Sequence, residues 1–144
     1  MNDGKVSDPF NLARFVEAQA SVYEQVISEL RCGVKRTHWM WFVFPQLRGL
    51  GQSSTAKYYG ISSLAEAKAY VVHPILGARL MTCTGLVLAT RNRSLGDIFG
   101  FPDDMKFRSS MTLFDATASG STVFRDALNR FSNGEPDTLT LELL

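Results

Sequence analysis

Polar and aromatic side chains gather most densely at His38, Trp39, Trp41 and Gln46. Two tryptophans so close together, beside a histidine, could form a stacking wall for a flat ligand such as a nucleobase. His38 could then bind a phosphate or act as an acid or base, because its charge changes near neutral pH. The same residues also suit a core aromatic cluster with one capped histidine, and both interpretations stay open.

A second group combines charged side chains with two hydroxyls. It consists of Asp103, Lys106, Arg108, Ser109 and Ser110. Ser110 lies between Phe107 and Phe114 on the apolar side of a predicted helix, so we expect it to face inward. Adjacent serines beside lysine and arginine could bind a phosphate or a carboxylate. The alternative is an ordinary helix start, with acidic residues first and a hydroxyl bonded to the preceding turn.

Two further features each allow both a functional and a structural interpretation. Gln19 falls on the apolar face of the first predicted helix, between Val16 and Tyr23, so its amide either braces another segment or faces a pocket. The glycine-containing loop at 49–54 could cradle an anion with its backbone N–H groups. It lacks the third glycine of a dinucleotide-binding loop and the lysine of a phosphate-binding loop, so a plain turn with a serine cap is the alternative.

The sequence offers no complete catalytic or metal-binding pattern. There are two histidines, and neither lies at metal-ligand spacing from a cysteine or from the other, so we expect no bound metal and no cofactor. Cys32 and Cys83 lie in apolar helical stretches and are expected to be free buried thiols, although a single bridge between them stays possible. His73 precedes Pro74, which suits a helix boundary.

Composition excludes several classes of protein. With 45% hydrophobic residues and a formal net charge of +1, the chain is not expected to be disordered. The near-neutral charge argues against a dedicated nucleic-acid binder, which carries a basic excess. Short basic clusters occur at 35–36, 91–93 and 106–108, and we interpret them as solvated faces and helix ends.

No segment predicts export or membrane insertion. Positions 1–7 are polar and have no apolar stretch of the kind found in signal peptides. No apolar run is as long as a bilayer requires. We therefore expect a cytoplasmic protein without a membrane partner, and the sequence names no protein partner.

Periodicity and capping residues predict an all-α protein, compact and multihelical, with six to eight helices in one domain over residues 1–144. The first helix is expected to run unbroken from Pro9 to Gly33, capped by Asp8. The apolar stretch 37–44 is either a short buried helix, which we favour, or a buried strand. The remaining predicted helices span 63–72, 75–90, 94–99, 102–118 and 122–132, with a final turn in 136–144.

Four strings together resemble a known family. They are DPFNLARFVEAQ at 8–19, HWMWFVFPQLRGLG at 38–51, HPILGARL at 73–80 and KFRSSMTLF at 106–114. On these strings the chain is similar, over nearly its whole length, to the bacterial family catalogued as domain of unknown function eighteen-ten. Val34 and Gly60 depart from the expected pattern. The resemblance implies a small multihelical domain and no established activity. The label calpastatin, sometimes attached to this family, does not fit a chain so rich in core aromatics.

Two classes of function remain. The first is a pocket that binds or hydrolyses a nucleotide-like molecule, with Trp39 or Trp41 stacking on the base. By faint analogy with small helical hydrolases of ADP-ribose derivatives, Glu17 or Asp103 would stabilise the developing cation. The second is a protein-interaction module without catalytic activity, and nucleic-acid binding is a distant third. The first hypothesis requires Gln19, His38 and Ser110 to meet in one hollow.

Overall fold

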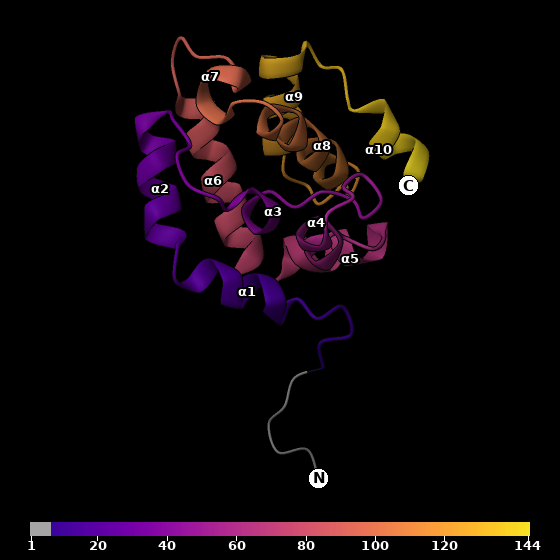
Figure 1. The fold of residues 1–144 in the computed structure, drawn as a ribbon. Coiled ribbons are helices and arrows are strands. Elements are labelled where there is room, and N and C mark those ends of the chain that lie inside the picture. Colours follow the sequence, from indigo (N-terminus) through magenta and orange to yellow (C-terminus); the bar gives the residue numbers. More distant parts are fainter. Residues whose placement is uncertain (1–6) are drawn as a thin grey trace.

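A computed structural model describes residues 7–144, and within that range the fold is all-helical (Figure 1). The helices are α1 (Ala13–Ala20), α2 (Tyr23–Cys32), α3 (Met40–Val43), α4 (Ser54–Tyr59), α5 (Leu64–Val72), α6 (Leu76–Ala89), α7 (Leu95–Phe99), α8 (Asp103–Asp115), α9 (Val123–Ser132) and α10 (Thr138–Leu143). The all-α prediction is confirmed, and the count of ten described helices exceeds the predicted six to eight.

The first predicted helix is in fact two helices. The chain leaves helical geometry at Val22, where φ is −123° and ψ is −4°, and α2 then runs in a different direction from α1 (Figure 1). The turn lets both helices bury an apolar face, because α1 lies against α3 while α2 packs along α6. Helix α4, which was not predicted, supplies the rest of the excess over the predicted count.

The apolar stretch 37–44 contains a short buried helix, as favoured, and not a strand. Helix α3 occupies its second half, with Met40 and Val43 buried. Phe44, which precedes Pro45, has left helical geometry at ψ 71°, as expected for a residue before proline. The predicted end of the helix at 102–118 is wrong. Helix α8 stops at Asp115, and Ala118 is exposed with a positive φ of 51°.

Aromatic side chains from distant segments meet in one core. Phe44, Phe99 and Phe107 contact each other with ring centroids 5.0 to 5.9 Å apart. Helix α8 lies at the centre, because it packs against α5, α7, α9 and α10, while α6 packs against α2, α5 and α9. The buried apolar residues form a single cluster that reaches from α1 to α9.

A buried ion pair joins α1 to α5. Arg14 donates to Glu66 Oε2 at 2.8 Å and to the backbone carbonyls of Phe10, Asn11, Tyr58 and Gly60. Glu66 Oε1 in turn accepts from the N–H and hydroxyl of Ser62. Ser63 and Glu66 have the residue types and spacing of a capping box, but only half of it forms: Ser63 caps the helix, and the Glu66 carboxylate bonds Arg14 and Ser62.

Other helix starts follow the sequence closely. Asp8 accepts from the N–H groups of Leu12 and Ala13, and Ser94 and Asp97 form a complete capping box at α7. His73 Nδ1 accepts from the N–H groups of residues 75 and 76 at the start of α6, which agrees with its predicted boundary role.

The two cysteines are both free but differ in environment. Cys83 is buried as predicted, and burial raises the pKa of its thiol to about 12. Cys32 is exposed at the last position of α2, so the prediction of a buried thiol is wrong there. In residues 7–144 no individual helix has the length and apolar character to cross a membrane; α5 and α6 pass that test only as a pair, bent by 87°.

Gly77 generates a prediction about stability. A Cβ at this position would lie 2.0 Å from the carbonyl oxygen of Val71, which is backbone and cannot move aside. We expect Gly77→Ala to lower the free energy of unfolding by about 2 kcal/mol or more, measured by chemical denaturation. Gly85 in the same helix has open space at its Cβ, so Gly85→Ala should raise it by about 0.5–1 kcal/mol. Equal effects of the two changes would contradict the close approach.

Candidate functional site

The main candidate site is a groove of about 430 Å³ between α8 and the segments on either side of it. One wall comes from α3 and the loop that leads into α4, the second from the start of α8, and the third from the start of α10. The lining residues are Trp41, Gln46, Leu50, Gly51, Gln52, Ser53, Ala56, Pro102, Met105, Lys106, Ser109, Asp137 and Leu139. Four predicted site residues, Trp41, Gln46, Lys106 and Ser109, thus meet here.

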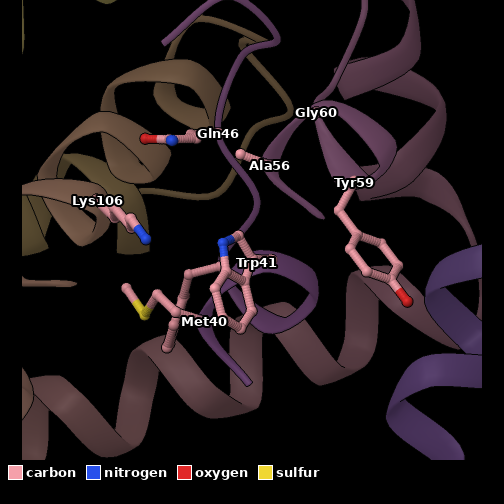
Figure 2. A pocket seen from close by; sticks show the side chains of 8 residues that line it. Met40, Trp41, Gln46, Ala56, Tyr59, Gly60 and Lys106 are labelled. Atoms are coloured by element: carbon pink, nitrogen blue, oxygen red, sulfur yellow. The ribbon is translucent and has the colours of Figure 1, made fainter. Parts of the chain in front are cut away.

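A niche of about 10 Å³, enough for roughly one water, shares part of this wall (Figure 2). Trp41, Gln46, Ala56 and Lys106 line both the groove and the niche. In Figure 2 the ammonium of Lys106 points toward Trp41, while the hydroxyl of Tyr59 points away from the niche. The niche therefore extends the groove inward beneath the indole.

Lys106 and Trp41 belong to a row of charged and aromatic groups. The ammonium of Lys106 lies 5.1 Å from the centre of the Trp41 ring and 3.5 Å from Asp103 Oδ1. Asp103 Oδ2 lies 2.9 Å from the ammonium of Lys35, which in turn lies 5.1 Å from the ring centre of Trp39. Two ammonium groups thus share one carboxylate, and the excess positive charge is at Lys106, beside the groove.

Helix α8 holds the third wall in place. Arg108 donates to the carbonyls of Glu135 at 3.1 Å and Pro136 at 3.0 Å, and the N–H of Asp137 donates to Thr112 Oγ1 at 2.8 Å. Asp137 then caps α10 by accepting from the N–H and the hydroxyl of Thr140. Arg108 is therefore a positioning residue, and it does not line the groove. The hydroxyl of Ser109, which does, donates back to the carbonyl of Met105.

Backbone pairing holds the first wall. The N–H of Arg48 donates to the carbonyl of Ile61 at 2.7 Å, and the N–H of Ile61 donates to the carbonyl of Gln46 at 2.9 Å. A Cβ at Gly51 would lie 2.5 Å from the Cβ of Ala56, so a glycine is required where the loop passes over α4. The loop at 49–54 has the alternative form considered for it, a turn whose Ser53 caps the following helix.

Trp39 belongs to the core and not to the groove. It is 1% exposed, and its Nε1–H donates to Glu29 Oε1 at 3.0 Å. Glu29 also accepts from the N–H groups of Arg36 and Thr37, the hydroxyl of Thr37 and the amide of Gln25. Burial alone would raise the pKa of Glu29, but these hydrogen bonds outweigh it and lower the pKa to about 2. Glu29 thereby fixes the segment that leads into α3.

The predicted hollow shared by Gln19, His38 and Ser110 does not form. The amide of Gln19 donates to the carbonyl of Phe42 at 2.6 Å and to the hydroxyl of Tyr70 at 3.1 Å, so it braces α3 against α5. His38 is exposed on the segment before α3, outside the core cluster considered for it. Ser110 faces inward as expected, and within residues 7–144 its fully buried hydroxyl has no hydrogen-bond partner.

Residues that sequence reasoning did not single out complete the site. Asp137 and Leu139 form the third wall, and the helix signal at Pro136–Asp137 was the available clue. Glu29 lies at helical spacing from Val26 on the inner face of α2, which marks it as a buried carboxylate. Glu17, considered for cation stabilisation, is exposed and lines a different cavity together with Asp8 and His73. In the described part of the chain no cluster of three metal-ligating side chains occurs.

Comparisons with known proteins agree with this architecture. The family described as Protein of unknown function (DUF1810) matches residues 9–144. The chain belongs to this family. A similar solved structure is the 1.38 Å crystal structure of the conserved hypothetical protein Rv1873 from Mycobacterium tuberculosis. The two chains are 56% identical with a TM-score of 0.94, and the match covers 95% of this chain and 98% of the other. None of the curated proteins matches this DUF1810 protein.

The buried carboxylate of Glu29 predicts a specific response to acid. Its pKa is lowered from 4.5 to about 2 in the folded chain, which corresponds to about 3 kcal/mol of stability above pH 4.5. This contribution is lost as the pH falls from 4.5 to 2. Glu29→Gln should therefore be about 3 kcal/mol less stable than wild type at pH 7, and the difference should shrink steadily in acid. Denaturant titrations across this pH range measure it.

Glu24→Gln, on the exposed side of the same helix, is the matched control and should change stability little at any pH. A Glu29→Gln penalty that stays the same from pH 7 to pH 2 would contradict the assigned role of the carboxylate.

The unpartnered hydroxyl of Ser110 predicts a stabilising substitution. Burying a hydroxyl without a partner costs free energy, and Ser110→Ala removes that cost while changing the side-chain volume little. We expect the free energy of unfolding to rise by about 1 kcal/mol. Ser109→Ala removes a hydroxyl that is bonded to Met105 and should lower it by about 1 kcal/mol. Thermal and chemical unfolding of the two variants measure both changes in stability. A loss of stability in Ser110→Ala would contradict the prediction.

Proposed function

We propose that the groove of this DUF1810 protein binds a small, flat, anionic molecule of the nucleotide class. The observation that carries the proposal is the position of Lys106, whose ammonium lies 5.1 Å from the Trp41 ring centre at a wall both residues share. An aromatic face beside a cation is suited to a ligand that joins an aromatic ring to a phosphate.

The charge balance around Asp103 supports an anionic ligand. Lys35 lies 2.9 Å from this carboxylate and already compensates its charge, whereas Lys106 lies 3.5 Å away. The Lys106 side chain also remains 24% exposed, so its ammonium can reach a ligand without leaving an unpaired carboxylate behind. A phosphate in the groove would complete this row of alternating charges.

The remaining walls suit a nucleobase. Leu50, Met105 and Leu139 supply apolar surface, and the amides of Gln46 and Gln52 can pair with the edge of a heterocycle. A volume of about 430 Å³ is within the usual range for ligand pockets, roughly 300–1,000 Å³.

The proposal concerns binding and does not extend to hydrolysis. Asp103 is held by two lysines, and Glu17 lies at a different cavity, so neither carboxylate that was considered for catalysis is positioned to act in the groove. His38 does not line the groove either.

Calorimetric titration tests the proposal with three ligands: AMP, adenosine and inorganic phosphate. We expect AMP to bind more tightly than either fragment. Lys106→Met should weaken AMP binding by about tenfold, or about 1.4 kcal/mol, and leave adenosine binding nearly unchanged. Trp41→Leu should weaken both, because it removes the stacking surface. Lys57→Met is the matched control, since this exposed lysine does not line the groove.

Failure of all three ligands to bind at millimolar concentration would overturn the proposal, as would equal losses in Lys106→Met and Lys57→Met. In that case the exposed apolar side chains around the groove would favour the second candidate function, a protein-interaction surface. Phe101 is 81% exposed, Met105 58% and Leu139 50%, and these side chains lie at or beside the groove.

A further inference from the structure

Four exposed arginines lie at the end of the helix bundle where α2 and α6 terminate. Arg31 is in the last turn of α2, Arg91 and Arg93 follow α6, and Arg130 is in the last turn of α9. In Figure 1 the end of α2 and the connection from α6 to α7 lie together at the upper left. We call these four residues the arginine end.

Contacts between the elements bring the arginines to one surface. A Cβ at Gly33 would meet Arg93 Cδ at 3.1 Å and Thr90 Cγ2 at 3.3 Å, so Arg93 lies across the end of α2. The guanidinium of Arg130 donates to the carbonyl of Thr90, which places α9 against the same connection. Arg31 precedes Gly33 by two positions and Arg91 follows Thr90 directly, so both flank these contacts.

The charge of the arginine end is largely uncompensated. None of the four takes part in an ion pair with a carboxylate of residues 7–144. Asp97 is nearby, and its pKa is lowered mainly by hydrogen bonds from Ser94, with the charge of Arg93 adding a smaller effect. Cations at helix C-termini offset the negative end of the dipole, but three helix ends do not account for four arginines.

The surroundings of the arginine end indicate what kind of partner fits. None of the four arginines lines the groove, its niche or the cavities beside α1, α4 and α7, so a small enclosed ligand is not favoured. The strongly exposed apolar side chains of the described chain, such as Phe101 and Leu139, lie on other segments. A surface without apolar anchors is poorly suited to a protein interface core or to insertion in a membrane.

We propose that the arginine end binds the phosphate backbone of double-stranded nucleic acid. Guanidinium groups pair well with phosphate oxygens, and the duplex presents phosphates at high density along an open surface. A single strand is less favoured because its binders stack bases on aromatic rings, and Phe131, the nearby ring, is half-buried and covered by Arg130 at 4.9 Å. Binding through phosphates is independent of base sequence, because phosphate contacts carry no direct sequence information.

This inference refines the expectation drawn from net charge. A chain with a net charge of +1 is not a strong nucleic-acid binder as a whole, but the average hides a local excess. The contact is therefore weak and strongly dependent on salt. It is also separate from the groove, so either proposal can fail without the other.

Fluorescence anisotropy with a short labelled DNA duplex tests the inference. Four phosphate contacts give a slope of about −3.6 in a plot of log affinity against log salt, or a loss of about 100-fold between about 50 and 200 mM salt. Arg31→Ala/Arg91→Ala should reduce the slope to about −1.8 and the loss to about 10-fold. Neither side chain makes a hydrogen bond within the described residues, so the variant should fold normally, which thermal unfolding checks.

The matched control is Lys57→Ala/Lys68→Ala, which removes the same charge from exposed positions outside the arginine end. It should leave the slope close to the wild-type value. Equal weakening in both double variants would show a net-charge effect only and would overturn the proposal. Absence of duplex binding at low salt would also overturn it, as would tighter binding to a poly-glutamate peptide or to anionic vesicles.

Discussion

The arrangement of the groove depends on one buried guanidinium. Arg14 spends its N–H donors on four backbone carbonyls and on Glu66, and two of those carbonyls belong to Tyr58 and Gly60. The next residue, Ile61, pairs with the backbone of Gln46 and so carries this constraint to the first wall. A buried ion pair adds little net stability over an apolar substitute, but it fixes geometry, because loss of one partner leaves a buried charge unpaired. The main effect of this ion pair is therefore to fix the positions of the segments that form the first wall.

Local signals in the sequence were sufficient for most helices and for half of the site. Caps such as Ser94 with Asp97, and the proline before α6, act within one turn of the chain, so periodicity and residue type predict them well. Trp41, Gln46, Lys106 and Ser109 could also be predicted as candidates, because each belongs to a local group of polar, charged or aromatic residues. Their meeting in one groove required the packing of α8 against α3, which no local pattern specifies.

The predictions that failed depend on contacts between distant residues. Gln19 and Ser110 were grouped with His38 because both were expected to point inward, yet facing the interior does not determine which part of it a side chain reaches. Glu29 was overlooked because a glutamate suggests an exposed position, whereas donors seven to ten residues later, together with Gln25, satisfy it. The break at Val22 has a similar origin. The helical pattern of the sequence continues through this residue, but the packing gained when the chain turns there outweighs the local preference for helix.

The position of α10 affects how the protein should be handled. Because Asp137 and Leu139 close one side of the groove, and Leu143 reaches toward Gly49, α10 contributes to the wall of the groove as well as to the shell of the fold. A purification tag fused directly behind α10 would crowd the opening. Proteolysis between α9 and α10 during storage would remove part of the wall itself.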